Sequence, residues 1–398
     1  MKRSVLFGSI VSFFVVILLV FSPESFAQEK EFKWPRFLRI ATPGTASASF
    51  ASTNAWAPLL QGDTGTMARV IPEDSEPGRY VRLAIKKEFE LASISTADAR
   101  FSREGIDAYS TLKGAPTRIV WHHNDTPWLF VVRGDSKFKT IYDLKQEGVK
   151  VSVSSQAPTM ALAVKKALPA FLGWTPEEAE KNWTFVPSGS YAENCRSVTD
   201  GRADVTWVAP ISSVLAEMSG HPKGIRFLGQ PLDDKEGWEG WLKYRPTHIP
   251  SKINMGVSAA IGVDGLTSNF IYWTYGDMNE DTVYNMAKWL NENFDKYKDS
   301  HALCKRMSIG YFREFLNHCG LPVHKGTVKY LREIGKWTED DDKWNEEAIE
   351  KEGKWFQARE KALKEADEKG VKMHWENEEF LKIIKKHTEG LPIFKTRL

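Results

Sequence analysis

The sequence predicts an α/β protein built from two lobes of similar design, joined by crossing strands and followed by a helical segment. Strand and helix patterns alternate in the order strand, helix, strand, helix, strand, and this order then restarts, as expected of parallel sheets. The first strand of each half runs into a turn rich in hydroxyl side chains. A chain of 398 residues, 42% hydrophobic and 27% charged, is long enough for two cores. The formal net charge of +2 gives no reason to expect nucleic acid as a partner.

The first 27 residues have the pattern of a secretory signal peptide. Lys2 and Arg3 precede an apolar run over residues 5–21, and Ser25 and Ala27 are the small residues before a cleavage point. We therefore expect an exported, periplasmic protein cleaved after Ala27. Because the apolar run approaches the length that spans a membrane, an uncleaved anchor is the open alternative.

The first half opens with a short apolar strand at residues 38–41, which breaks at Pro43-Gly44. Small hydroxylated residues follow, and a helix is expected from residue 52 onward. Ligands of α/β proteins sit at such strand-to-helix turns, where unpaired N–H groups point outward. The turn is therefore a candidate ligand site, and an ordinary turn is the alternative. The next expected elements are a strand, a helix and a strand at residues 68–71, 78–88 and 89–94.

Two further strands are predicted at residues 118–121 and 128–133, on either side of the polar segment His122-His123-Asn124-Asp125. The two histidines could suggest a metal pair. Because adjacent residues on a strand point to opposite faces, we reject that interpretation.

The second half repeats the pattern of the first. Its opening strand ends in Ser154-Ser155-Gln156-Ala157-Pro158-Thr159, where Ser155 or Thr159 could cap the helix that follows. The expected strands and helices occupy residues 149–153, 160–171, 183–186, 191–200 and 203–208.

The chain turns helical toward its C-terminus. A helix with one apolar face is predicted at residues 281–293, and residues 339–386 are dense in Glu and Lys with interspersed aromatics. That composition is typical of amphipathic helices with a solvated charged face, and a partner-binding face is the alternative. The expected division is residues 28–125 with about 248–335 as lobe one, 126–247 as lobe two, and 336–398 as a charged helical extension.

Three cysteines leave one unpaired in an exported protein. Cys304 and Cys319 are close enough in sequence for a disulfide, in which case Cys195 would be a buried thiol. The chain has no Cys-x-x-Cys and no His-Glu-x-x-His, so we expect neither a metal site nor a cofactor.

Several blocks, taken in order, resemble the TAXI family, the extracytoplasmic solute receptors of TRAP transporters. Residues 40–45, Ile-Ala-Thr-Pro-Gly-Thr, resemble its opening strand and loop. Residues 200–205 and 207–210, Asp-Gly-Arg-Ala-Asp-Val and Trp-Val-Ala-Pro, follow the family in order and spacing, and residues 320–330 resemble its closing segment. The resemblance covers roughly residues 38–337.

The chain departs from the family pattern where that family holds its ligand. Pro43, Ala46 and Ser47 replace glycines, and Tyr80 replaces the usual Asn. The loop at residues 154–159 also lacks the family's glycines. The departures put the identity of the ligand in doubt more than the fold.

The resemblance implies a bilobed periplasmic binding protein-like fold and a receptor that captures a small organic ligand, carboxylate-bearing by expectation, between its lobes. The implied partners are the membrane permease subunits of a TRAP transporter. A receptor for an ABC importer or a sensor kinase is the open alternative. An exported enzyme is disfavoured because the chain has no Gly-x-Ser-x-Gly and its histidines form no set with Ser or Cys.

The candidate ligand-binding residues are hydroxyl side chains at strand ends and aromatic residues near the predicted cleft. For each hydroxyl the alternative is a helix cap or turn, and for Trp207 and Phe50 it is core packing. Arg79 and Arg82 could bring positive charge to the cleft, but a solvated helix face is the expectation for both. The candidates are Thr45, Ser47, Ser49, Phe50, Ser95, Thr96, Trp121, His122, Ser154, Ser155, Thr159, Tyr191 and Trp207.

Overall fold

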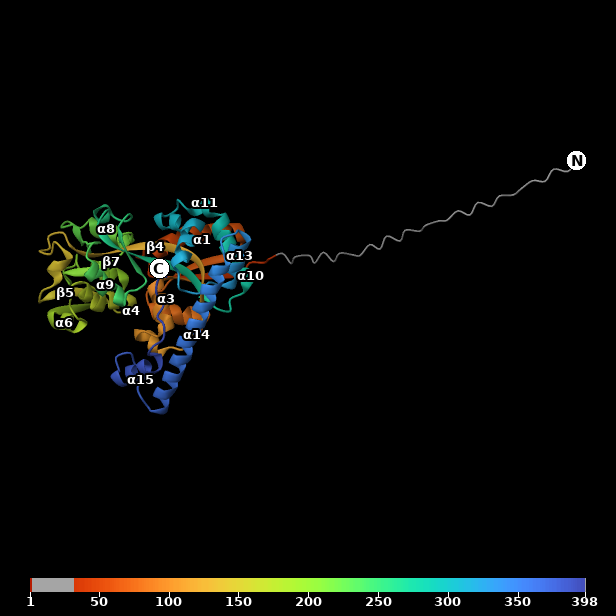
Figure 1. The fold of residues 1–398 in the computed structure, drawn as a ribbon. Helices are drawn as coiled ribbons and strands as arrows, with labels where there is room; N and C mark the ends of the chain where they lie inside the picture. The colour runs from red at the N-terminus through yellow and green to blue at the C-terminus, as the bar shows by residue number, and fades with distance from the viewer. Residues whose placement is uncertain (2–31, 398) are drawn as a thin grey trace. The chain divides into compact units, whose positions relative to one another are not determined.

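A computed structural model of the chain describes residue 1 and residues 32–397. Except for Met1, the expected signal peptide lies outside the described residues. Trp34–Leu398 forms one compact unit, drawn in Figure 1. None of the helices formed by residues 32–397 is long and apolar enough to cross a membrane.

Lobe one is built on a mixed sheet in the order β2-β1-β3-β10-β4. β1 pairs in parallel with β2 and with β3, whereas β10 runs antiparallel to both of its neighbours. The strands are β1 (Phe37–Thr42), β2 (Met67–Pro72), β3 (Leu91–Ser95), β4 (Thr117–Arg133) and β10 (Asp264–Tyr275). Its helices and helical turns are α1 (Ala48–Thr64), α2 (Glu76–Tyr80), η1 (Val81–Ile85), α3 (Thr96–Glu104), η2 (Asp107–Thr111), α10 (Glu280–Glu292), α11 (Phe294–Tyr297), η6 (Ala302–Met307), α12 (Ile309–His318) and α13 (Lys325–Glu333).

Lobe two is built on the sheet β4-β7-β5-β6, with β8 also paired to β4. β5 runs parallel to β6 and β7, so the restarted strand–helix alternation does produce a second, partly parallel sheet. The strands are β5 (Val149–Ser154), β6 (Trp183–Ser188), β7 (Val205–Val208) and β8 (Ile225–Leu228). Its helices and helical turns are η3 (Ile141–Leu144), α4 (Pro158–Leu162), η4 (Ala163–Ala167), α5 (Leu168–Phe171), α6 (Pro176–Asn182), α7 (Tyr191–Arg196), α8 (Ser213–Ser219), α9 (Lys235–Tyr244) and η5 (Ser258–Ala260).

The lobes are joined by long strands that pass from one to the other (Figure 1). β4 pairs with β10 along its first part and with β7 and β8 along its last. β9 (His248–Lys252) adds to the free side of β10. The prediction of two strands around residues 122–125 is therefore wrong, because one strand runs through them. His123 fits inside that strand since its two ring nitrogens hydrogen-bond to the hydroxyls of Ser52 (2.7 Å) and Ser93 (2.8 Å).

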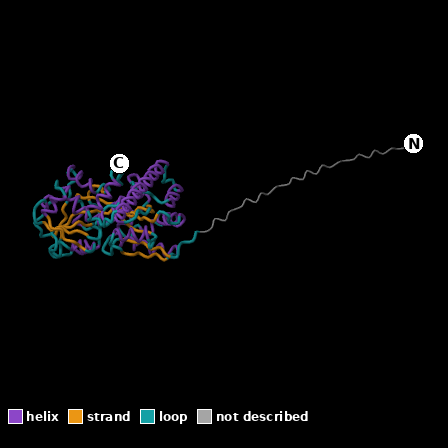
Figure 2. Tube along the Cα trace, turned by 90° about the horizontal axis from the view of Figure 1, so that it is seen from below, coloured by secondary structure: helices purple, strands orange, loops and turns teal. Residues whose placement is uncertain are grey.

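Each lobe has a core of its own, and most of the tryptophans are used in these cores. Trp56, Trp121 and Trp273 are fully buried in lobe one, and Trp241 in lobe two. Figure 2 shows strands in both halves of the unit with helices around them.

The C-terminal segment forms two helices, α14 (Glu339–Glu368) and α15 (Glu378–Thr388). α14 packs on α3 of lobe one and leads away to α15, with which it shares a small apolar cluster around Phe380 (Figure 1). Glu352 of α14 is buried between Arg103 (3.2 Å) and Arg118 (2.6 Å). The charged extension is thus tied to lobe one by an ion cluster, although its sequence suggested a solvated face.

Some expected elements differ in their ends. The helix predicted at residues 78–88 is split into α2 and the π-turn η1, and it begins earlier because Ser75 caps the N–H of Gly78. α7 ends at Arg196 rather than near residue 200. All three cysteines are buried free thiols, so Cys304 and Cys319 do not form the disulfide that their spacing allowed.

Candidate functional site

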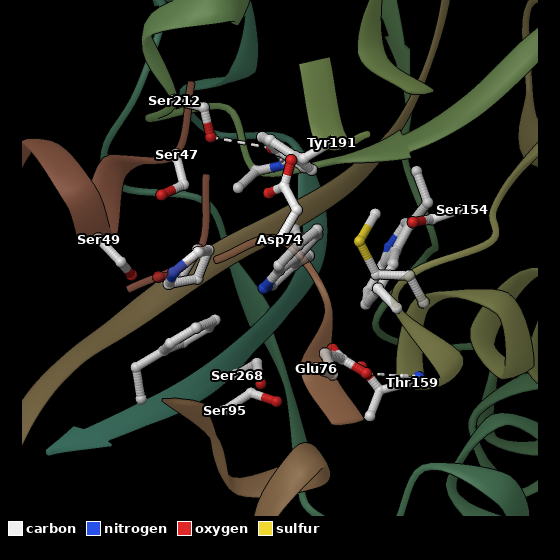
Figure 3. A pocket seen from close by; sticks show the side chains of 18 of the residues that line it. Ser47, Ser49, Asp74, Glu76, Ser95, Ser154, Thr159, Tyr191, Ser212 and Ser268 are labelled. Atoms are coloured by element: carbon white, nitrogen blue, oxygen red, sulfur yellow. Dashed lines mark hydrogen bonds between the residues drawn. The ribbon is translucent and has the colours of Figure 1, made fainter. Parts of the chain in front are cut away.

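A cavity lies between the two lobes, against the strands that join them (Figure 3). The volume open to the centres of water-sized spheres is about 70 Å³. Since roughly 10–15 Å³ of such space holds one water, the cavity has room for a small molecule. It is lined from lobe one by Pro43, Ser47, Ala48, Ser49, Asp74, Glu76, Arg79 and Ser95, from the joining strands by Thr126, Trp128, Ser268 and Phe270, and from lobe two by Ser154, Gln156, Ala157, Thr159, Met160, Tyr191, Trp207, Ala209, Ser212 and Arg245.

The turn after β1 forms part of the lobe-one wall. The N–H of Gly44 donates to a carboxylate oxygen of Asp74 (2.7 Å). A Cβ at position 44 would lie 2.3 Å from that oxygen, so a larger residue would displace the Asp74 carboxylate and break this contact. Ser47 caps α1 by accepting from the N–H of Phe50 (3.1 Å). The hydroxyl of Ser47 therefore serves as a helix cap and also faces the cavity.

Arg79 brings a buried positive charge to this wall. Its side chain is 3% exposed, which corrects the expectation of a solvated helix face. It donates to the carbonyl of Glu73 and lies 3.4 Å from a carboxylate oxygen of Asp98. Arg82 keeps the expected surface role and pairs with Glu73 and Glu88.

Asp98 lies behind Arg79 and is fully buried. The Tyr109 hydroxyl donates to its other oxygen. Burial, and then the charge of Glu76, raise the pKa of Asp98 to about 8, against the lowering effect of Arg79. At neutral pH this carboxyl group is therefore mostly protonated, and it compensates little of the charge of Arg79.

Glu76 connects the two lobes. One of its carboxylate oxygens accepts from the Thr159 hydroxyl (2.5 Å) and the other from the Thr159 N–H (3.0 Å). Arg245 in turn donates to the Thr159 carbonyl and lies 2.7 Å from the ring of His248. Burial raises the pKa of Glu76 and lowers that of Arg245 to about 9.

Several residues that line the cavity carry a buried donor without a hydrogen-bond partner in the described part of the chain. They are buried, and they come from both lobes and from the joining strands. An unpaired buried donor is costly, whereas an acceptor-rich ligand would satisfy it. The atoms are Arg79 Nε, Arg245 Nε, Trp128 Nε1, Trp207 Nε1 and Ser268 Oγ, of which the hydroxyl could also accept.

The apolar part of the wall is dominated by two stacked indoles. Trp128 and Trp207 lie 4.2 Å apart between ring centroids at an interplanar angle of 23°. Arg245 lies over the Trp207 ring at 5.5 Å. The cavity thus combines a flat aromatic surface with two guanidinium groups, which lie beside the carboxylates of Asp74 and Glu76. An aromatic surface with guanidinium donors suits a small anion that has an apolar or planar part.

Seven of the thirteen candidate residues line this cavity. They are hydroxyl or aromatic residues at strand ends, as the turn argument expects: Ser47, Ser49, Ser95, Ser154, Thr159, Tyr191 and Trp207.

The other six candidates do not line it. Thr45 and Ser155 are exposed, and Phe50 is a half-buried residue of α1. Trp121 is in the core of lobe one, where its indole N–H donates to the Met307 carbonyl (2.7 Å). Thr96 and His122 line a second cavity, together with Asp125, Thr267 and Asn269. These last three alternate along β4 and β10 with Thr126, Ser268 and Phe270, so the second cavity lies behind the joining strands.

Sequence reasoning missed the charged residues Glu76 and Arg245 and the strand residues Trp128, Ser268 and Phe270. Trp128 could have been found from the two-residue alternation, had residues 122–133 been interpreted as one strand. Ser268 and Phe270 lie on β10, a strand that the sequence analysis did not predict. Arg245 follows α9 in a connecting segment that carries no local signal. Among residues 32–397, no three His, Cys, Asp or Glu side chains gather as a metal site would require.

The model of the NMT1-like family matches residues 40–335. No curated protein sequence matches the chain. Similar solved structures include XAC2383 from Xanthomonas citri bound to chloride ion (12% identity, 70% of this chain and 89% of that one, TM-score 0.42). They also include PhnD1 from Prochlorococcus marinus (MIT 9301) in complex with methylphosphonate (12% identity, 80% and 98%, TM-score 0.41). The aliphatic sulphonate binding protein SsuA from Escherichia coli is more weakly similar (11%, 79% and 86%, TM-score 0.36). At these scores they carry no argument about the ligand of this chain.

Proposed function

Since the chain belongs to the NMT1-like family, we propose that it is an extracytoplasmic receptor that captures a small organic anion between its lobes. The fold is that of the bilobed periplasmic binding proteins, with two α/β lobes and crossover strands. The observation that carries the proposal is the set of unpaired buried donors around the cavity, two of them on guanidinium groups. A carboxylate has about four acceptor positions and is the natural complement of such a set.

The proposed role is binding without turnover. None of the described residues that line the cavity is a histidine or a cysteine. Ser268 lies opposite His248 in the β9–β10 pair, but its hydroxyl makes no hydrogen bond to that ring or to any other described group. The pairing of nucleophile and base that a nucleophilic mechanism requires is therefore not formed there. The serine hydroxyls serve instead to accept from and donate to a bound solute.

The proposed recipient of the solute is the membrane permease of a TRAP transporter, which is what the resemblance of the sequence to TAXI receptors implies. The proposed location is the periplasm, after removal of residues 1–27. The recipient can be tested by reconstituting candidate permeases in vesicles. Ion-gradient-driven uptake that needs this chain would support the TRAP assignment, and ATP-driven uptake would assign it to an ABC importer.

Capture of an anion can be tested on the mature chain from Gln28 onward. A panel of small organic acids is screened by melting temperature, and intrinsic tryptophan fluorescence is followed because Trp128 and Trp207 line the cavity. A ligand present at 100 times its Kd should stabilise the folded protein by about 2.7 kcal/mol. Mass spectrometry of molecules retained through purification gives the identity. An unchanged melting temperature and fluorescence with every acid, and no retained molecule, would count against the proposal.

A further inference from the structure

The carboxylate of Glu76 lies in the wall of the cavity, at the boundary between the two lobes. It belongs to lobe one, yet both of its oxygens are bound by donors of lobe two, the hydroxyl and the N–H of Thr159. Its own N–H donates to the carbonyl of Gln156 across the same boundary (3.1 Å). The residue is 7% exposed and lines the cavity, as Figure 3 shows. The protein therefore supplies from one lobe an anion that the other lobe recognises.

The charges around the cavity are balanced before any ligand enters. Its lining contains two carboxylates, Asp74 and Glu76, and two guanidinium groups, Arg79 and Arg245. Burial raises the pKa of Glu76, and the charges of Arg79 and Arg245 act against that rise. Asp98 lies behind Arg79 but is mostly protonated at neutral pH, so it adds little negative charge to this balance. A ligand with one negative charge can still accept from the free Nε–H of each arginine. A second negative charge on the ligand would lie near Asp74 or Glu76, and no further cation among the described residues lines the cavity to pair with it.

The free donors and the available space also fit one carboxylate rather than two. Five donor atoms are without partners in the described chain, and one carboxylate accepts about four hydrogen bonds. The remaining space of about 70 Å³ corresponds to a few water molecules. The donors that would hold a second carboxylate, those of Thr159, are already occupied by Glu76.

We propose, on the basis of the proposed function, that Glu76 determines specificity by standing in for the second carboxylate of a ligand. The receptor then selects small acids with a single carboxylate and rejects dicarboxylates. Replacing Glu76 frees the two donors of Thr159 and removes one negative charge beside Arg79 and Arg245. A dicarboxylate can then bind with its second carboxylate in the vacated position.

Isothermal titration calorimetry on the mature chain tests this with two pairs of probes that differ by one charge and hardly in shape. The pairs are succinamate with succinate and glutamine with glutamate. The variants are Glu76→Gln, which keeps the size of the side chain, and Glu76→Ala, which also makes room. Glu88→Ala is the control, since this glutamate lies on the surface and pairs with Arg82. Circular dichroism verifies that each protein is folded.

We expect the wild-type chain and Glu88→Ala to bind the singly charged member of a pair at least tenfold more tightly than its dicarboxylate. We expect Glu76→Gln to reduce that preference at least tenfold and Glu76→Ala to reduce or invert it. The specificity role is refuted if the wild-type chain binds a dicarboxylate as tightly as its monoamide, or if both Glu76 variants keep the wild-type preference. Either result leaves anion capture standing. If Glu76→Ala does not fold, Glu76→Gln and the wild-type preference decide. If no acid of the set binds any of the proteins, the proposed function fails and this inference with it.

Discussion

The buried carboxyl group of Asp98 should make the stability of the protein depend on pH in a definite direction. Its pKa is about 8 in the folded protein, mainly because it is buried, against 3.8 for an ordinary aspartate. The folded chain therefore keeps a proton on Asp98 that the unfolded chain has lost. A raised folded pKa contributes stability that is fully present below the unfolded pKa and is lost as the pH rises through the folded one. Between pH 5 and 7 one proton separates the two states, which lowers the free energy of unfolding by about 1.4 kcal/mol per pH unit.

Asp98→Asn removes this titration. The free energy of unfolding of the variant should therefore fall less steeply with pH than that of wild type, by about 1.4 kcal/mol per pH unit. The measurement is guanidinium unfolding of the mature chain at pH 5, 6 and 7, followed by tryptophan fluorescence. Buried histidines such as His123 and His248, whose pKa values burial lowers, act in the opposite direction, but they are common to both proteins and cancel in the comparison. Glu88→Gln is the control, because Arg82 lowers the pKa of Glu88 below 4.5 and this group is mostly ionised in both states over this range. Equal slopes for wild type and Asp98→Asn would refute the assignment of a proton to Asp98.

Three further predictions concern the cavity, the C-terminal helix and the thiols. Arg245→Met should raise the Kd for a singly charged acid about 10- to 150-fold, the equivalent of a charge-assisted hydrogen bond of about 1.5–3 kcal/mol. Titration calorimetry measures this Kd. An equal rise in Kd from the surface change Arg82→Met would contradict the prediction. Glu352→Ala removes the carboxylate that pairs with both Arg103 and Arg118 and should cost about 3–5 kcal/mol in denaturant unfolding. Glu350→Ala, at an exposed pair with Lys354, should leave the unfolding midpoint almost unchanged. Burial raises the pKa of every cysteine thiol to about 12, so a thiol reagent should modify none in the native protein and three after unfolding; fewer than three would indicate a disulfide.

The hydroxyl part of the site could be predicted because it depends on local chain direction. Ser95 and Ser154 are the last residues of β3 and β5, and Ser47 lies in the turn that follows β1. Parallel strands bring such ends to one edge of a sheet, and two sheets facing each other bring both sets together. An apolar run followed by serines is visible in the sequence, so no knowledge of distant partners was needed.

The charged part could not be predicted because it depends on contacts between distant residues. Glu76 and Thr159 are 83 positions apart, and Arg79 and Asp98 are 19 apart. In the sequence, an arginine on a short helix looks like a solvated residue, and only its contacts with distant residues show that it is buried. The same reason explains the missed continuity of β4, whose His123 is satisfied by Ser52 and Ser93 from other elements.

Closure of the lobes and choice of ligand are linked through Glu76 if the proposed specificity is right. The lobes are connected by bonds that involve no ligand, from Thr159 to Glu76, from Ser213 to the Ala46 carbonyl (3.2 Å) and from Arg100 to the Tyr244 carbonyl (3.2 Å). Such bonds favour the closed arrangement before binding, and a ligand that needs that arrangement then loses less affinity to closing it. Removing the Glu76 carboxylate takes away one of these bonds together with the barrier to a second ligand carboxylate. A dicarboxylate bound to Glu76→Ala would therefore have to restore the contact to Thr159 itself, so in that variant closure would depend on the ligand more than it does in the wild-type chain.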